Sequence, residues 1–213
     1  GLISGVATAA RALRPGIEVI GVQTERFPPV WNAVHGEQRE CARATIADGI
    51  AVASPGALTV PLILERVNDV LLVSEEDVEQ AILMLLEIEK TVVEGAGAVG
   101  LAALMKHRAR FAGRNVGLIL CGGNIDPLVL ASIIERGMVR AGRLARIRVG
   151  VRDVPGSLAR ITALVAEAGA NIEEVRHQRA FTSLSVQNAE IELVMQTRSH
   201  AHVTEVLNIL QKA

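Results

Sequence analysis

Aromatic side chains are almost absent from this chain. Its 213 residues include one Trp, three Phe and no Tyr, although half of all residues are hydrophobic. The interior must therefore be built from Val, Ile, Leu and Ala side chains, which a chain of this length supplies in sufficient number. Aliphatic cores of this kind are typical of a buried sheet that helices cover on both faces.

Other absences narrow the range of functions. A formal net charge of −1 provides no basic surface for nucleic acid or for an anionic membrane. The sequence has no apolar run long enough to span a bilayer and no visible secretory signal. Cys41 and Cys121 lack metal-ligand spacing, and the five His residues form no ligand pattern. We therefore expect reduced thiols, a cytoplasmic protein, and neither nucleic acid nor membrane as a partner.

The first part of the chain alternates between helical and extended patterns. We expect strands over residues 17–22, 70–73 and 116–120 and helices over residues 3–13, 28–35, 58–67, 95–105 and 127–136. A further helix begins after Ser74, which is a good N-cap and is followed by three acidic residues in the first turn. Strands that alternate with helices predict an α/β fold with a parallel sheet.

The pattern changes at residues 140–144, a polar stretch with a Gly that predicts a linker between domains at 1–139 and 145–213. After it we expect a strand over residues 145–151, a helix over 156–168, strands over 171–178 and 186–196, and a helix over 200–210. This βαββα order is that of a ferredoxin-like βαββαβ unit without its last strand.

The chain opens with a Gly and a helix of small residues, Gly1-Leu2-Ile3-Ser4-Gly5. A Gly allows close approach of another backbone, and the N–H groups of a first helical turn favour an anion. This opening is compatible with the end of a phosphate-binding loop and also with an ordinary Gly before a helix. Because no strand precedes it, we expect the chain to be part of a longer protein.

Several motifs in a fixed order carry a family resemblance. Residues 1–5 (GLISG), 45–52 (TIADGIAV), 93–98 (VEGAGA) and 120–126 (LCGGNID) resemble the C-terminal half of a threonine ammonia-lyase, also called threonine dehydratase. Residues 153–158 (DVPGSL) and 170–172 (ANI) resemble the signature of an ACT domain. The resemblance covers essentially the whole chain. It implies part of a pyridoxal-phosphate enzyme of fold type II, the tryptophan-synthase-β type, followed by one ferredoxin-like ACT domain.

The resemblance also assigns a cofactor site. It implies that Gly1 and Leu2 hold the phosphate of pyridoxal 5'-phosphate, and that Cys121 and Gly122 lie beside the pyridine nitrogen. A thiol there leaves the nitrogen largely neutral, which suits rapid β-elimination of water. Glu94 is implied to lie next to the ring, where it holds the ring or a hydroxyl by hydrogen bonding or takes part in proton transfer. From the residues alone, Cys121 could be a small buried side chain, and Glu94 could cap the helix that begins at Gly95.

Two further expectations concern what is missing from the motifs. The family binds its cofactor through a Schiff-base Lys in an upstream motif, and Lys90, Lys106 and Lys212 stand in other contexts. We therefore expect this polypeptide to be inactive alone. Some relatives bind a divalent cation at an acidic residue after the strand at 17–22, where this chain has Gln23, so we predict no metal site.

The ACT resemblance implies a site for an amino-acid effector. Gly156, Ser157, Leu158 and Asn171 are the candidate contacts, and isoleucine or valine is the implied effector. In ACT domains the ligand typically lies between the loop before the helix and the sheet of a neighbouring subunit, so a homo-oligomer is expected. A purely dimerising module that binds no ligand is the alternative.

The residues and the resemblance together favour a lyase that converts threonine to 2-oxobutanoate and ammonia, with amino-acid feedback. A serine dehydratase or serine racemase is an alternative within the same fold. A noncatalytic amino-acid-binding regulatory chain is an alternative from another class. A third alternative, a structural oligomerisation module, would show no stabilisation by amino acids.

Overall fold

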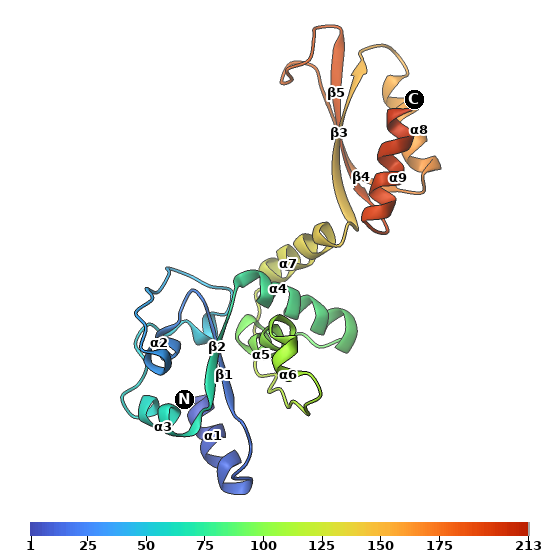
Figure 1. The fold of residues 1–213 in the computed structure, drawn as a ribbon. Coiled ribbons are helices and arrows are strands. Elements are labelled where there is room, and N and C mark those ends of the chain that lie inside the picture. Colours follow the sequence, from blue (N-terminus) through green and yellow to red (C-terminus); the bar gives the residue numbers. More distant parts are fainter. Residues whose placement is uncertain (213) are drawn as a thin grey trace. The chain divides into compact units, whose positions relative to one another are not determined.

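A computed structural model describes residues 1–212, which form two compact units that meet between Ile133 and Ile134 (Figure 1). The boundary between the units falls inside the helix α7 (Pro127–Arg140), which continues beyond the predicted end at residue 136. After α7, a turn with Gly142 at a φ of 65° leads directly into a strand that begins at Leu144. No described helix combines the length and the apolar character that crossing a membrane requires.

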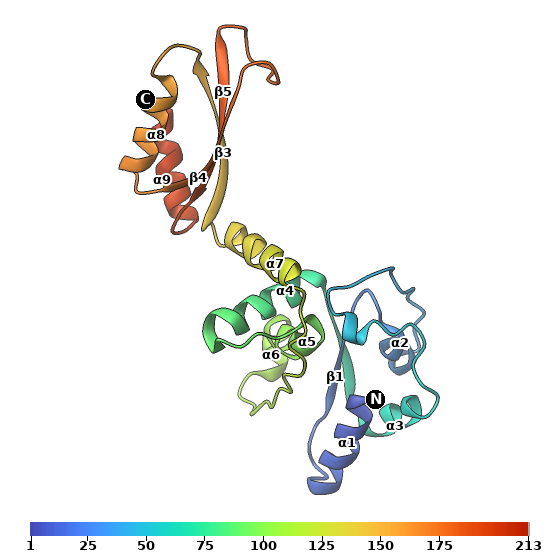
Figure 2. The ribbon, with the colours of Figure 1, turned by 180° about the vertical axis from the view of Figure 1, so that it is seen from behind.

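The first unit is built around two parallel strands, β1 (Ile20–Thr24) and β2 (Asp69–Val73). Its helices are α1 (Leu2–Leu13), α2 (Pro29–His35), α3 (Thr59–Arg66), α4 (Glu75–Met84), α5 (Gly95–Lys106) and α6 (Arg108–Phe111). A 3₁₀ turn spans Asp48–Ile50, and a π-helical turn, Leu85–Glu89, continues α4. Helices α1 to α3 lie on one side of the two strands and α4 to α6 on the other, as Figures 1 and 2 show. The prediction of a parallel sheet covered on both faces is confirmed.

The core of this unit lies between the strands and the helix pair α4 and α5. Val73, Val78 and Ala98 are completely buried there, and no aromatic side chain belongs to the buried residues of this core. Ser74 caps α4 as predicted: its hydroxyl accepts from the Asp77 N–H, while the Asp77 carboxylate accepts from the Ser74 N–H. This reciprocal capping box fixes the point at which the chain leaves β2.

The prediction of a buried strand at residues 116–120 is wrong for the residues that the structure describes. This apolar segment pairs with neither β1 nor β2, and Ile119 is 55% exposed. Apolar residues favour a strand only where a second strand satisfies their backbone N–H and C=O groups. Within residues 1–212 no strand supplies those partners.

The second unit has the predicted βαββα order. Its elements are β3 (Leu144–Arg152), α8 (Ser157–Glu167), β4 (Asn171–Gln178), β5 (Asn188–Gln196) and α9 (His200–Gln211). The strands form an antiparallel sheet in the order β3-β5-β4, and both helices lie on the same face of it (Figures 1 and 2). Ile191, Leu193 and Met195 of β5 are completely buried beneath the helices.

Candidate functional site

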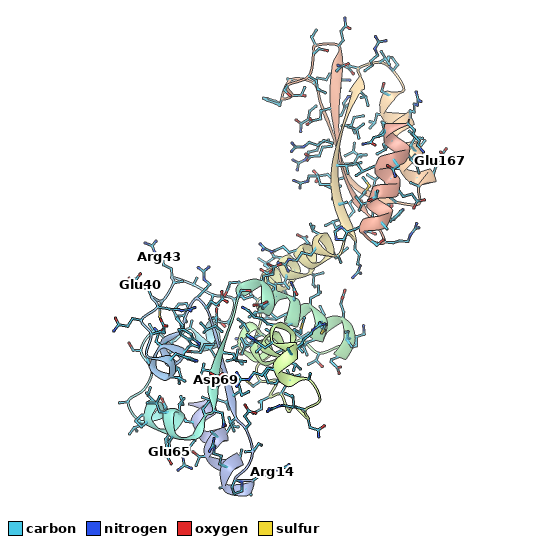
Figure 3. All side chains as sticks on the ribbon, in the orientation of Figure 1. Arg14, Glu40, Arg43, Glu65, Asp69 and Glu167 are labelled. Carbon is cyan, nitrogen blue, oxygen red and sulfur yellow. The ribbon has the colours of Figure 1, made fainter. Side chains whose placement is uncertain are left out.

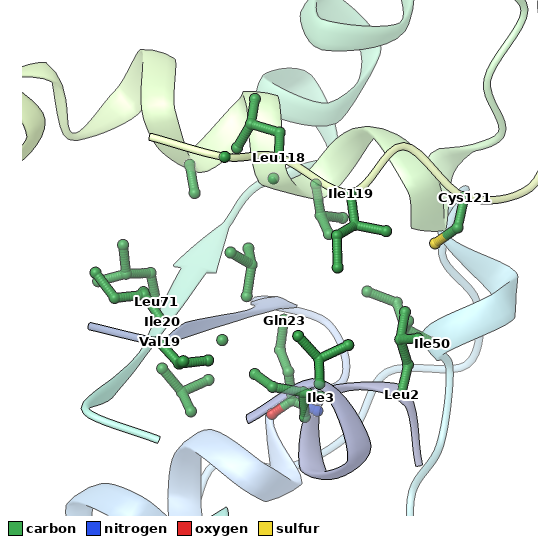
Figure 4. A pocket seen from close by; sticks show the side chains of 18 of the residues that line it. Leu2, Ile3, Val19, Ile20, Gln23, Ile50, Leu71, Leu118, Ile119 and Cys121 are labelled. Carbon is green, nitrogen blue, oxygen red and sulfur yellow. The ribbon is translucent and has the colours of Figure 1, made fainter. Parts of the chain in front are cut away.

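The first unit contains a cavity of about 1030 Å³. Its walls come from α1, β1, the Asp48–Ile50 turn, the start of α5 and the segment at residues 114–122 (Figure 4). The five residues predicted to bind a cofactor all line this cavity: Gly1, Leu2, Glu94, Cys121 and Gly122. Residues far apart in the sequence therefore meet in one place.

The start of α1 forms one wall of the cavity. Gly1 is the N-cap residue and has no side chain with which to satisfy the N–H groups that follow it. Its carbonyl accepts from the Gly5 N–H at 3.3 Å and from the Ser4 hydroxyl at 2.8 Å. The N–H groups of a first helical turn have no acceptors within their own helix, and the helix dipole is positive there. This wall is suited to an anionic group.

Glu94 is held at the cavity through its backbone. Its N–H donates to the Gly122 carbonyl at 3.1 Å, and its own carbonyl accepts from the Gly97 and Ala98 N–H groups at 3.0 and 3.1 Å. Glu94 is the N-cap residue of α5, yet its side chain caps no N–H group of the helix. The interpretation of Glu94 as a capping carboxylate is therefore wrong, and the carboxylate remains available to the cavity.

Three glycines allow the segments around Glu94 to approach one another. A Cβ atom on Gly97 would lie 2.1 Å from the Cys121 carbonyl oxygen, and one on Gly95 would lie 2.2 Å from the Ile46 carbonyl oxygen. Backbone atoms therefore exclude a side chain at both positions. Gly122 has a φ of 82°, which favours glycine, and a Cβ atom there would lie 2.0 Å from the Glu94 Oε1 atom.

Cys121 lies at the edge of the cavity and its thiol points inward (Figure 4). The side chain is exposed and free of any disulfide, so the interpretation of Cys121 as a small core residue is wrong. Leu2 and Ile50 line the same cavity (Figure 4).

The sequence did not assign chemistry to residues 45–52, yet this segment builds part of the site. Gly49 and Ile50 line the cavity, and a Cβ atom on Gly49 would lie 3.0 Å from the Ala96 Cβ and 3.5 Å from the Glu94 Oε1 atom. The signal available in the sequence was the pair Asp48-Gly49, which is also an ordinary turn signal.

Gln23, which stands where some relatives have an acidic metal ligand, caps a helix. The Gln23 Oε1 atom accepts from the Val30 N–H at 3.0 Å and the Trp31 N–H at 2.8 Å, so Gln23 caps α2. Among residues 1–212, no three His, Cys, Asp or Glu side chains are grouped so that they could hold a metal ion. The absence of a metal site stays a prediction.

None of the lysines lines the cavity. Lys90 has a left-handed backbone, and its ammonium donates to the Glu87 carbonyl at 2.5 Å. Lys106 lies between Glu25 and Asp77, with N–O distances of 2.8 and 2.9 Å. Burial lowers the pKa of Lys106, but the bonds to the two carboxylates outweigh it and hold the pKa above its ordinary value.

In the second unit, the predicted effector contacts separate into two groups. Gly156, with a φ of 91°, is the N-cap residue before α8, and the neighbouring Ser157 hydroxyl donates to the Arg152 carbonyl at 2.8 Å. Leu158 packs against the core. Asn171 is paired with Gln196, which is paired in turn with Leu144 at the opposite end of β3 from Arg152.

The length of β3 keeps these two groups apart. The strand has nine residues, which corresponds to roughly 25–30 Å of extended chain. One copy of the chain therefore does not bring Asn171 to the start of α8.

Comparison with known proteins divides the chain in a similar way. Residues 1–122 match the family described as "Pyridoxal-phosphate dependent enzyme", and residues 145–213 match the ACT domain. The cavity lies entirely within the first of these matches.

Curated relatives match across both units. The chain is 41% identical over 213 residues to the L-threonine ammonia-lyase of Geobacter sulfurreducens, with 99% of the chain and 53% of the relative aligned. It is also 41% identical over 212 residues to the L-threonine ammonia-lyase of Thermotoga maritima, again with 99% and 53% aligned. The chain thus spans about half the length of these relatives.

Solved structures resemble about three fifths of the chain. A threonine deaminase from the organism abbreviated T.th. is 39% identical, with a TM-score of 0.54 over 59% of this chain and 46% of that protein. Maize serine racemase is 32% identical, with a TM-score of 0.55 over 65% of this chain and 44% of that protein.

Proposed function

Since the chain belongs to the family of pyridoxal-phosphate dependent enzymes and carries an ACT domain, we propose that the protein containing it converts threonine to 2-oxobutanoate and ammonia. The observation that carries this proposal is the convergence of Gly1, Leu2, Glu94, Cys121 and Gly122 on one cavity. Identity of 41% to L-threonine ammonia-lyases along 99% of the chain supports threonine as the substrate.

The residues around the cavity fit pyridoxal phosphate. The uncapped N-terminus of α1 suits the phosphate group, and the volume of about 1030 Å³ is in the range of cofactor and ligand sites. When bound, this cofactor supplies an electron-withdrawing ring that eases loss of the substrate's α-proton and β-hydroxyl.

The side chains of this chain tune and orient that chemistry. Cys121 presents a thiol to the cavity. A thiol as the partner of the pyridine nitrogen leaves that nitrogen largely neutral, which favours elimination over racemisation. Glu94 presents a carboxylate that can accept a hydrogen bond from the ring or the substrate hydroxyl, or accept a proton. The backbone bond between the Glu94 N–H and the Gly122 carbonyl holds both groups at the same end of the cavity.

The replacement Cys121→Asp tests this assignment in the protein with its complete catalytic domain. A carboxylate at this place would keep the pyridine nitrogen protonated, so we expect slower formation of 2-oxobutanoate and more racemisation or transamination of threonine. Cys41→Asp is the matched control, because Cys41 is also exposed but lies outside the cavity. Product ratios that stay the same in Cys121→Asp would reject the role of the thiol.

A second function, amino-acid binding without catalysis, is supported for this chain alone by the absence of any lysine from the cavity lining. Its ligand would be isoleucine or valine, bound at the start of α8 by Gly156, Ser157 and Leu158. Addition of either amino acid should then raise the melting temperature of the second unit in proportion to the logarithm of ligand excess. A melting temperature unchanged by millimolar isoleucine and valine would leave the ACT unit as a dimerising module.

The position of Asn171 supports a homo-oligomer. If Asn171 contacts the effector, it has to come from a second copy, because its own chain carries it at the far end of the sheet from Gly156. The outer edges of β3 and β4 are unpaired among the described residues and could meet a second sheet. Two free cysteines support a reducing compartment, the cytoplasm.

A further inference from the structure

We propose that Glu75 is a positioning residue that holds residues 45–50, the wall segment, against the start of α5 and thereby fixes the place of Glu94. The catalytic part of this proposal rests on the proposed function, whereas the structural part stands on contacts within the first unit. No motif of the sequence pointed to Glu75, which lies in the acidic first turn of α4.

The carboxylate of Glu75 joins three segments of the chain. Its Oε1 atom accepts from the Thr45 hydroxyl at 2.5 Å and from the Thr24 hydroxyl at 3.3 Å. Its Oε2 atom accepts from the Ile46 N–H at 2.9 Å. Glu75 thus connects the end of β1 and the wall segment to the start of α4.

The hydrogen bonds of Glu75 are at least partly shielded from water. Thr24 is completely buried, and Thr45, Ile46 and Glu75 are each partly buried. Hydrogen bonds to an ionised acceptor are about twice as strong as those between neutral groups. The Thr45 hydroxyl, while donating to Glu75, also accepts from the Ala47 N–H at 3.1 Å, so the same contact shapes the turn of the wall segment.

The helix α4 does not need Glu75 for its own start. Ser74 and Asp77 already form a complete capping box at that end. The Glu75 side chain instead bonds to groups outside α4, which indicates that its task is to hold the wall segment.

The wall segment transmits this constraint to Glu94 by direct contact. The Ile46 carbonyl and the Ala47 Cα pack so closely on Gly95 that a Cβ atom there would lie 2.2 and 2.9 Å from them. Gly49 lies close to Ala96, the next residue of α5, since a Cβ atom on Gly49 would lie 3.0 Å from the Ala96 Cβ. Because Glu94 directly precedes this contact, a displaced wall segment removes the support on one side of Glu94.

Amide hydrogen exchange on this chain tests the structural part. Glu75→Gln keeps an acceptor for the hydroxyls but turns an NH₂ group toward the Ile46 N–H, so the Ile46 amide should exchange about tenfold faster or more. The amides of Glu94 and Gly97 should also exchange faster, although neither bonds to Glu75. Thr45→Val removes the hydroxyl and should accelerate exchange at the same amides to a smaller extent. Thr45→Ser keeps a hydroxyl, and its exchange should stay close to that of the parent chain.

Glu65→Gln is the matched control, because Glu65 lies on α3 (Figure 3) and its ion pair is with the adjacent Arg66. It should leave exchange at all of these amides unchanged. Unchanged exchange at Ile46 in Glu75→Gln would overturn the proposal. So would faster exchange at Ile46 with unchanged exchange at Glu94 and Gly97, or equal acceleration throughout the first unit.

The catalytic part is tested in the protein with its complete catalytic domain. Glu75→Gln should lower kcat more than it raises KM for threonine, and Thr45→Ser should retain kcat better than Thr45→Val. A change confined to the melting temperature would contradict a positioning role. If the parent protein has no threonine activity, the proposed function fails while the exchange result still decides the role of Glu75 in the wall.

Discussion

At the scale of single residues, the candidate site depends as much on missing side chains as on reactive ones. Glu94 and Cys121 are adjacent to the same cavity only because Gly97 and Gly122 leave room for their backbones and for one carboxylate. Gly97 lies in the first turn of α5, and the close approach of the Cys121 carbonyl decides the residue at this position.

A pair of substitutions within α5 separates close packing from helix propensity. Gly97→Ala should lower the free energy of unfolding by about 1–3 kcal/mol, because the new Cβ would lie 2.1 Å from the Cys121 carbonyl oxygen. Gly100→Ala should raise it by about 0.5–1 kcal/mol, since its Cβ would meet only the Leu118 Cδ2 at an ordinary 3.5 Å. Urea unfolding measures both, and equal effects of the two substitutions would contradict the packing argument.

At the scale of elements, much of the fold could be predicted from the sequence. Periodicity and turn residues predicted the helices within a few residues, apart from the short α6, and the Ser74 cap is as predicted. The strand expected at residues 116–120 failed because a strand depends on a partner that apolar character alone does not reveal.

The candidate site was only partly predictable. Gly1, Glu94 and Cys121 could be assigned through a family resemblance, because their motifs are local and ordered. The bonds from Glu75 to Thr45 and Ile46 cross long stretches of chain and follow no local pattern, so the sequence alone did not reveal them. The same holds for Gln23, whose side chain caps a helix that begins several residues later.

The capping box of α4 yields a prediction about stability and pH. Burial raises the pKa of Asp77, but bonds from Ser74 and Lys106 outweigh it and hold the pKa below its ordinary value of 3.8. Asp77→Asn should therefore lower the free energy of unfolding by about 1 kcal/mol at neutral pH. A lowered folded-state pKa stabilises the protein above the unfolded pKa, and this contribution is lost as the pH falls through the folded value.

The difference between Asp77→Asn and the parent chain should therefore shrink as the pH is lowered below about 4. Urea unfolding at several pH values measures it. Ser132→Ala is a suitable control, because the Ser132 hydroxyl bonds back to the Leu128 carbonyl within α7 and caps no N–H group. A difference that persists undiminished at low pH would contradict the assigned ionisation of Asp77.

At the scale of the whole molecule, one chain combines the candidate cofactor cavity with an ACT domain. The cavity belongs to the first unit and the candidate effector contacts belong to the second. If both sites operate, effector and threonine must alter each other's binding by the same factor, because coupling between binding sites is reciprocal.

The central claim is that the cavity of the first unit belongs to a pyridoxal-phosphate enzyme that deaminates threonine. The most direct test is to supply threonine to the natural protein containing these residues, loaded with pyridoxal phosphate, and to quantify 2-oxobutanoate and ammonia. We predict equal amounts of the two products, with formation strongly reduced in Glu94→Ala. Bound pyridoxal phosphate without any 2-oxobutanoate from threonine would contradict the claim.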